Sequence, residues 1–161
     1  APKSVAKRAP VKKAPARKAA VTKATVKKAA TLPRGTSLGR IVAGFTANDA
    51  EATIKWYCDV LGFKVIERWE HEGQFMGAQI GSGDVLLNIG QDDWKQGKDR
   101  AKGAGTRLYI SMGPDVDGYA AAIKARGGTL SHEPRTEWNM RAFSLKDPDG
   151  YNLTFLHELG N

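Results

Sequence analysis

The sequence predicts an α+β protein made of two βαβββ modules, with a tail of different composition in front of them. Alternating apolar residues indicate strands, and apolar residues at i, i+3, i+4 and i+7 indicate two helices, in the same order in both halves. The glycines that end the helices, Gly62 and Gly127, are 65 residues apart. The last-strand cores, Leu87–Ile89 and Leu153–Phe155, are 66 residues apart. A period of this size indicates an internal duplication.

The first module is predicted over residues 38–90. Apolar residues alternate from Ile41 to Phe45, as in a strand with one buried face. Asn48 or Asp49 is expected to cap a helix that Gly62 ends. Three further strands are expected near residues 63–69, 74–80 and 85–89.

The second module is predicted over residues 105–158. A strand over residues 106–112 is followed by Asp115, which is expected to cap a helix that Gly127 and Gly128 end. Three strands are expected near residues 129–132, 140–145 and 151–156. Residues 91–104, rich in charge and glycine, are predicted to form the crossover between the modules.

Residues 1–37 form a basic tail that is expected to be disordered. They hold eleven Lys or Arg residues and no Asp or Glu, whereas residues 38–161 hold fourteen basic and seventeen acidic residues. Such a segment has too little apolar surface to offset the entropy of ordering. Its composition resembles the Lys/Ala/Pro tails of linker histones and of histone-like bacterial proteins. That resemblance implies sequence-independent binding to nucleic acid or another polyanion. The basic clusters are Lys7, Arg8, Lys12, Lys13, Arg17, Lys18, Lys23, Lys27 and Lys28.

Two other interpretations of the tail stay open, a flexible solubilising extension and an organelle transit peptide. The single cysteine, Cys58, excludes an internal disulfide and is expected to be a buried thiol on the first helix. The sequence has no apolar run long enough for a membrane span and no apolar core of a secretory signal at its start. We therefore expect a cytoplasmic protein with no membrane partner, with association with the nucleoid as a further possibility.

Two motifs carry a resemblance to a known superfamily. The stretch NDAEATIKWYCDVLGF matches the pattern D-x7-Y-x3-LGF, and DPDGYNLTF matches the ending DPDGN-x-[IL]-E-[LF] apart from Tyr151 and Thr154. In both, the chain resembles the vicinal-oxygen-chelate superfamily of glyoxalase I, extradiol dioxygenases, fosfomycin-resistance enzymes and bleomycin-binding proteins. The resemblance implies that the two modules form an open, cup-shaped eight-stranded sheet with the helices on its outer side.

In the metal-using members of that superfamily, a His on each first strand and a Glu or Gln on each last strand bind a divalent ion. The corresponding positions here are Val42, Asn88, Arg107 (or Leu108) and Thr154. None of these is a good ligand, so we expect no metal, no other cofactor and no catalytic residue. The three histidines, His71, His132 and His157, have no metal-binding spacing and are expected at the surface.

The cup is instead expected to bind a small planar or anionic molecule. The stretch TEWNMRAFSLKDPDG resembles the metal-free, bleomycin-resistance-like branch, which implies ligand sequestration, for example of an antibiotic. Aromatic walls and polar groups suit stacking and directional hydrogen bonds. The candidate ligand-binding residues are Trp69, Phe75, Asn88, Arg107, Tyr109, Trp138 and Thr154.

We expect a homodimer, because an open cup leaves edges and apolar surface for a second copy to cover. Two alternatives of a different class stay open. One is a metal-dependent lyase, isomerase or dioxygenase with displaced ligands, and the other is a histone-like nucleic-acid-associated protein that acts through its tail.

Overall fold

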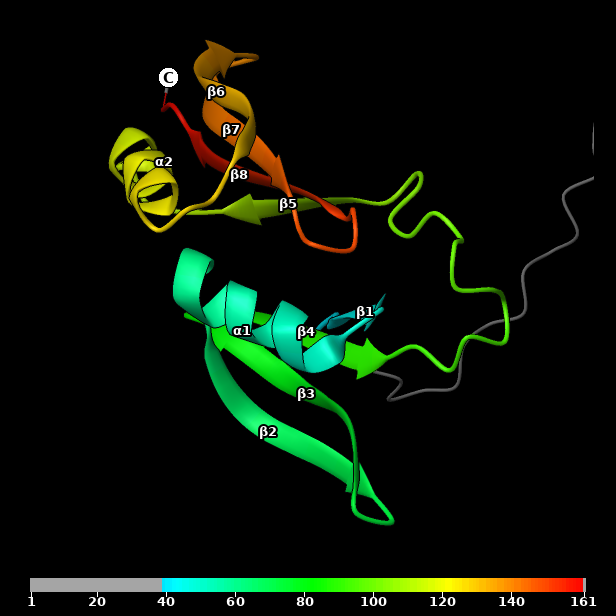
Figure 1. Ribbon diagram of the computed structural model, residues 1–161. Coiled ribbons are helices and arrows are strands. Elements are labelled where there is room, and N and C mark those ends of the chain that lie inside the picture. Colours follow the sequence, from blue (N-terminus) through cyan, green and yellow to red (C-terminus); the bar gives the residue numbers. More distant parts are fainter. Residues whose placement is uncertain (1–38, 161) are drawn as a thin grey trace, which may run out of the picture. The chain divides into compact units, whose positions relative to one another are not determined.

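The computed structural model describes residues 39–160, and residues 40–161 form one compact unit. The described chain runs strand, helix and three strands, and then repeats that order (Figure 1). This confirms the α+β fold and the two βαβββ modules. The predicted tail, with its basic clusters, lies outside the described residues.

Module one contains one helix and one four-stranded sheet. Its elements are β1 (Ala43–Ala47), α1 (Ala50–Leu61), β2 (Lys64–His71), β3 (Gln74–Ser82) and β4 (Val85–Gln91). The strand order is β1-β4-β3-β2, with β1 parallel to β4 and the other pairs antiparallel. Asp49 caps α1 by accepting a hydrogen bond from the backbone N–H of Ala52, and Gly62 ends it with a φ of 75°.

Module two repeats this arrangement. Its elements are β5 (Arg107–Ser111), α2 (Val116–Ala125), β6 (Leu130–Glu137), β7 (Met140–Lys146) and β8 (Asn152–Glu158). The strand order is β5-β8-β7-β6, with only the pairing of β5 and β8 parallel. Asp115 caps α2 through the backbone N–H of Gly118, as expected.

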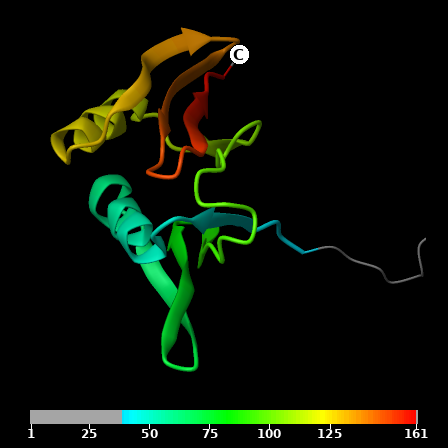
Figure 2. The same ribbon diagram turned by 45° about the vertical axis from the view of Figure 1, so that its right-hand side comes forward.

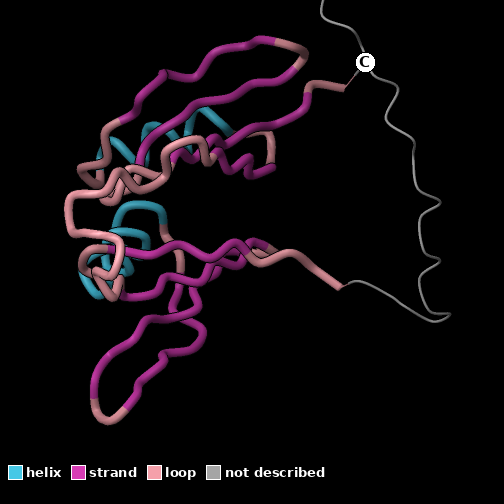
Figure 3. The backbone as a smooth tube through the Cα atoms, turned by 90° about the vertical axis from the view of Figure 1, so that its right-hand side faces the viewer, coloured by secondary structure: helices cyan, strands magenta, loops and turns pink. Residues whose placement is uncertain are grey.

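Each helix packs against one face of its own sheet (Figures 2 and 3). The apolar residues on that face form the core, with the largest buried side chains at Tyr57, Phe143, Ile80, Leu87, Ile89, Ile123, Leu145, Leu153 and Val116. The eight strands form two separate four-stranded sheets rather than one continuous ladder. No helix within residues 39–160 is long and apolar enough to cross a membrane.

The two modules are joined by a contact that we call the clasp, between the turn Asp147–Tyr151 of module two and β1 and α1 of module one. The Asp149 carboxylate accepts hydrogen bonds of 2.7 Å from the backbone N–H of Asn48 and from the Thr53 hydroxyl. The Tyr151 ring stacks on Phe45, with 4.1 Å between ring centroids. The sequence DPDGY therefore fixes how the two modules of one chain meet.

The buried part of the clasp is a hydrogen bond of 3.0 Å from the Tyr57 hydroxyl to the Asp147 carboxylate. That carboxylate also accepts from the backbone N–H groups of Asp149 and Tyr151. Burial raises the pKa of Asp147, while the hydrogen bonds from Tyr151 and Tyr57 oppose the rise. Burial also raises the pKa of Tyr57, and the neighbouring Asp147 adds to the shift.

Replacing Tyr57 by Phe is expected to lower the free energy of unfolding by about 1.5–3 kcal/mol, the usual range for a hydrogen bond to a charged group. The buried carboxylate would lose one donor with nothing to replace it. Urea unfolding followed by circular dichroism measures the change. Tyr109→Phe is the matched control, because the Tyr109 hydroxyl is exposed and should cost less than about 0.5 kcal/mol. Equal stability of the two variants would show that the clasp contributes little.

Candidate functional site

Each sheet has one face covered by its helix and one that we call its open face. On β5, Leu108 and Ile110 are at least partly buried, whereas Arg107, Tyr109 and Ser111 are exposed. This alternation places Arg107, Tyr109 and Ser111 on the open face. Tyr109 leaves 65% of its surface exposed, although it is a large aromatic residue in the middle of the edge strand β5.

The register of the strands locates the positions that hold metal ligands in the superfamily that the sequence resembles. Thr154 on β8 lies beside Tyr109 on β5, and Asn88 on β4 lies beside Gly44 on β1. The two modules therefore place these last-strand residues in the same register. The corresponding first-strand positions lie two residues earlier on each open face, at Val42 and Arg107.

These positions do not fit a divalent ion. Val42 has no donor atom, and Arg107 carries a positive charge. The Asn88 carbonyl oxygen already accepts a hydrogen bond of 3.0 Å from Gln79, and the Thr154 hydroxyl lies 3.2 Å from that of Ser144. Divalent ions prefer carboxylates and imidazoles. Within residues 39–160, no three His, Cys, Asp or Glu side chains are grouped so that they could hold a metal ion.

The open face of module two contains a pocket of about 290 Å³. It brings together four of the candidate ligand-binding residues, Arg107, Tyr109, Trp138 and Thr154. Its other lining residues are His132, Arg135, Glu137, Met140, Ala142, Phe143 and Ser144. All eleven come from module two, so among the described residues the two modules of one chain do not share this pocket.

Trp138 has an unusual backbone and an unusual exposure. It forms the turn between β6 and β7 together with Asn139, and their φ angles are 52° and 59°. Two positive φ values are typical of a type I′ turn, which favours Asn and Gly. A bulky residue in this conformation is strained, and such strain is concentrated at functional sites. The Trp138 side chain is 89% exposed, so its own module gains little from it.

The other three candidate residues lie in module one. Asn88 is on the open face, bonded to Gln79. Trp69 pairs with Gly77 on β3, one residue before the buried, helix-facing Ala78, so Trp69 also lies on the open face. Phe75 packs against the core.

The Phe75 ring lies under the Arg68 guanidinium, 4.4 Å from its centroid, and Arg68 bonds Glu51 on α1. Phe75 is therefore on the helix side of the sheet. Trp69 and Trp138 occupy different places in their modules, because Trp69 is inside a strand and Trp138 is in a turn.

Seven of the pocket residues were not among the candidates, and His132, Arg135 and Ser144 are three of them. The strand β6 was predicted to end at His132 but continues to Glu137, which brings Arg135 into the pocket. Arg135 pairs with Glu137 at 3.3 Å, whereas Arg107 has no ion pair with any described residue. The pocket therefore has an uncompensated positive charge next to aromatic surface. Of the other histidines, His71 is exposed at the end of β2, and His157 contacts the Met112 carbonyl at 3.0 Å.

The crossover contains a buried ion cluster that the sequence did not suggest. Lys102 Nζ lies 2.5 Å from the Asp92 carboxylate and 2.6 Å from the Asn48 side-chain oxygen, and Arg100 adds a contact of 2.7 Å to Asp92. The hydrogen bond from Lys102 is the main cause that lowers the pKa of Asp92 to about 2. The Lys102 ammonium also lies 5.2 Å from the ring centroid of Trp94. Since these groups are committed to one another, we assign them the role of holding the crossover against module one.

Residues 37–155 match the family described as "Glyoxalase/Bleomycin resistance protein/Dioxygenase superfamily". The chain is 28% identical over 124 residues to "Probable lactoylglutathione lyase, chloroplastic" of Arabidopsis thaliana, which covers 70% of this chain and 33% of that protein. It is 29% identical over 121 residues to "Lactoylglutathione lyase" of Haemophilus influenzae, which covers 67% of this chain and 84% of that protein. The chain thus spans about a third of the Arabidopsis protein.

Solved structures share the fold. TioX from Micromonospora sp. ML1 matches with a TM-score of 0.62 and 19% identity over 75% of this chain and 99% of that one. A superfamily member from Sphaerobacter thermophilus matches with a TM-score of 0.60 and 21% identity, over 75% of this chain and 98% of that one. A glyoxalase I mutant from Zea mays matches with a TM-score of 0.58 and 20% identity, over 74% of this chain and 44% of that one.

Proposed function

The chain belongs to the Glyoxalase/Bleomycin resistance protein/Dioxygenase superfamily, and from that premise we propose that it binds a small planar anion without a metal ion. The observation that carries the proposal is the strained and exposed Trp138 beside Arg107, Tyr109 and Thr154 in one pocket. The ligand's flat surface would stack on the aromatic rings. Its negative charge would lie on Arg107, which has no other ionic partner in the described chain.

The hydroxyl pair Ser144–Thr154 at the base of the pocket supports a polar ligand. Each hydroxyl can donate one hydrogen bond and accept others, so the pair keeps capacity for a carbonyl, phenol or carboxylate group. A glutamate at position 154 would place a negative charge opposite an anionic ligand. The neutral Thr154 therefore suits the same ligand that Arg107 attracts.

We further propose that the site is completed in a homodimer, by module one of a second copy. The pocket is lined by module two alone, and module one has its own open face with Asn88, Gln79 and Trp69. Module one also exposes large apolar side chains on β2 and β3, at Val65, Ile66 and Met76. Exposed apolar surface of this kind marks interaction sites.

A second candidate is a metal-dependent lyase whose ligands lie at positions other than those of its relatives. Two relatives carry the name lactoylglutathione lyase, and this favours the candidate. Against it stand the poor donors at Val42, Asn88, Arg107 and Thr154. The pocket has no second carboxylate beside Glu137 to help hold a cation.

Trp138→Asn is expected to raise the free energy of unfolding by about 1 kcal/mol, because Asn adopts the left-handed turn conformation with less strain. The same change is expected to weaken the binding of a planar aromatic carboxylate such as naphthoate about tenfold, through loss of stacking. Urea unfolding and isothermal titration calorimetry measure the two effects. Trp138→Phe is the control, since it keeps both strain and ring and should keep most of the affinity. Unchanged naphthoate affinity in the Asn variant, whatever its stability, would sink the functional interpretation of Trp138.

Sedimentation velocity of the full chain is expected to show a dimer. Ile66→Lys puts a charge on the apolar surface of module one, which opposes an apolar contact with a second copy. If the site combines module two of one copy with module one of another, this variant should be monomeric and should also bind naphthoate more weakly. Lys64→Glu, an exposed charge change on the same strand, is the control and should leave the dimer intact. Full binding by a monomeric variant would contradict the shared site.

Elemental analysis of protein purified without a chelator separates the two candidates. The proposal expects nickel, zinc, manganese and iron far below one atom per chain. Stoichiometric metal that is lost in Glu137→Gln or His132→Ala would overturn the metal-free proposal and favour the lyase. Glu133→Gln is the control, because Glu133 is exposed and pairs with Lys124 outside the pocket.

A further inference from the structure

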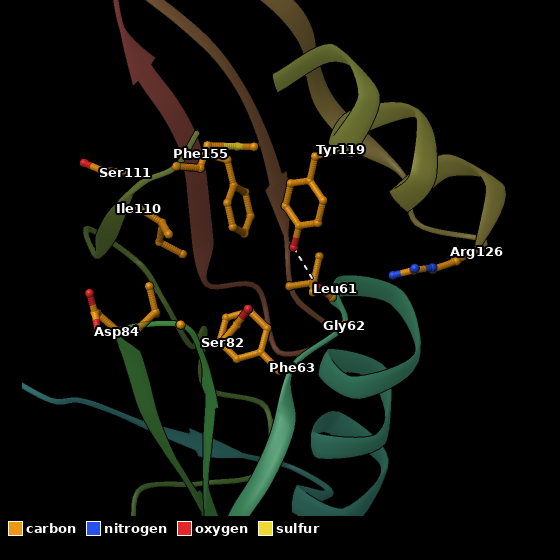
Figure 4. Close-up of a pocket in the computed structure, with 13 residues that line it drawn as sticks. Leu61, Gly62, Phe63, Ser82, Asp84, Ile110, Ser111, Tyr119, Arg126 and Phe155 are labelled. Atoms are coloured by element: carbon orange, nitrogen blue, oxygen red, sulfur yellow. Dashed lines mark hydrogen bonds between the residues drawn. The ribbon is translucent and has the colours of Figure 1, made fainter. Parts of the chain in front are cut away.

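A second cavity lies on the helix side of the protein, between the two modules, and has a volume of about 560 Å³ (Figure 4). We call it the inter-module cavity. Module one lines it with the corner between α1 and β2 and with the turn between β3 and β4. Module two lines it with β5, α2 and β8. It shares no described lining residue with the open-face pocket. On β8, Phe155 lines the cavity and Thr154 lines the pocket, because successive residues of a strand point to opposite faces.

Seven of the thirteen residues that line this cavity are apolar or aromatic. Phe63, Ile110 and Phe155 belong to the buried core and present an edge to the cavity. The Tyr119 ring packs edge-on against Phe155, with 5.2 Å between centroids. A concave apolar surface of 300–1,000 Å³ at a boundary between structural units is the usual form of a small-molecule site. The size and lining therefore suit a compact ligand with an aromatic or aliphatic body.

One strong donor at the edge of the cavity, the exposed Arg126, is unpaired within residues 39–160. The Arg126 guanidinium makes no hydrogen bond or ion pair with any described residue. It extends from the end of α2 toward the corner at Gly62, where an added Cβ atom would lie 3.3 Å from Nη1 of Arg126 (Figure 4). Arginine matches carboxylates with two parallel hydrogen bonds. The charge and geometry of Arg126 thus point to an anionic group.

A role for Arg126 in capping α1 does not use up its donors. The carbonyls of Tyr57 and Cys58 accept bonds from the backbone N–H of Gly62, and the Leu61 carbonyl accepts a bond of 2.7 Å from the Tyr119 hydroxyl. The positive charge of the guanidinium still stabilises the C-terminal end of α1, which carries the negative pole of the helix dipole. Its five N–H groups remain available to a ligand.

The acidic residue of the cavity, Asp84, lies at the end opposite Arg126 (Figure 4). Asp84 has no ion pair with any described residue, so it does not neutralise Arg126. A carboxylate at one end and a guanidinium at the other favour one orientation of an anionic ligand. The charged group would lie at Arg126, and the apolar body would extend over Phe63 and Phe155.

We propose that the inter-module cavity binds a small monoanion with an apolar body, of the arylalkyl carboxylate class. The carboxylate bonds Arg126, and the aryl group packs on the aromatic wall. The site is distinct from the open-face pocket and does not depend on the function proposed for that pocket. Because both modules line it, an occupant also ties them together at the end of α1 away from the clasp.

Titration of the full chain with phenylbutyrate, followed by amide NMR spectra, tests the proposal. Saturable shifts are expected at Gly62, Ile110 and Tyr119. Arg126→Gln should weaken binding about tenfold or more, as removal of a charge-assisted bidentate contact does. Arg126→Lys keeps the charge and should recover part of the affinity. Phenylbutanol, which lacks the carboxylate, should bind the wild type and Arg126→Gln equally weakly.

Arg107→Gln, in the open-face pocket, is the matched control and should leave phenylbutyrate binding in the cavity unchanged. Shifts confined to Tyr109 and Thr154 and abolished by Arg107→Gln would overturn the proposal while supporting the open-face site. Unchanged affinity in Arg126→Gln would also overturn it. Shifts at Gly62 and Ile110 that follow protein concentration without any probe would mean that a second copy fills the cavity, which again contradicts it. Thermal unfolding of each variant verifies that the fold is retained.

Discussion

The clasp between the Asp147–Tyr151 turn and α1 is the contact on which the rest of the structure depends. The Asp149 carboxylate bonds the backbone just before α1 and the hydroxyl of Thr53 in its first turn. A negative charge is favourable at that end of a helix, because the first N–H groups have no partner within the helix. Asp147 adds a bond to Tyr57 one turn further along. A turn of module two thus completes the N-terminal end of a helix in module one.

This constraint decides which surfaces of the chain can become sites. The modules meet through a turn and a helix, and the described residues that line the open-face pocket all belong to module two. The crossover also packs closely on the clasp turn. Gly103 lies so near the Gly150 carbonyl oxygen that a Cβ atom at position 103 would come within 2.6 Å of it. At the other end of α1, the hydrogen bond from the Tyr119 hydroxyl to the Leu61 carbonyl joins the two modules. The inter-module cavity lies beside that hydrogen bond.

The sequence predicted the parts of this structure that follow local rules. The caps at Asp49 and Asp115, the left-handed Gly62 and the alternation along β5 each depend on a few neighbouring residues. The length of β6 was not predictable in this way. Pro134 cannot donate to a ladder and suggests the end of a strand, but β6 is an edge strand and tolerates it.

Because β6 continues to Glu137, the hairpin turn falls at Trp138 and Asn139, and Trp138 is a turn residue. Four of the seven candidate ligand-binding residues nevertheless lie in one pocket, because the strand register of a duplicated module carries them there. Arg126 and Lys102 were missed for a different reason. Each is placed by a neighbour more than fifty positions away in the sequence. Arg126 lies beside Gly62, and Lys102 bonds Asn48. No local pattern records such contacts.

The duplication also explains why unlike modules would face each other in the proposed dimer. The two open faces keep the same framework, with Asn88 bonded to Gln79 in one module and Thr154 paired with Ser144 in the other. Their charges differ, since module two adds Arg107 and Arg135 around its pocket. Two cationic faces of module two would repel each other across a buried ligand. Pairing module two with the open face of module one, which carries the amides of Asn88 and Gln79 and the carboxylate of Glu67, avoids that repulsion.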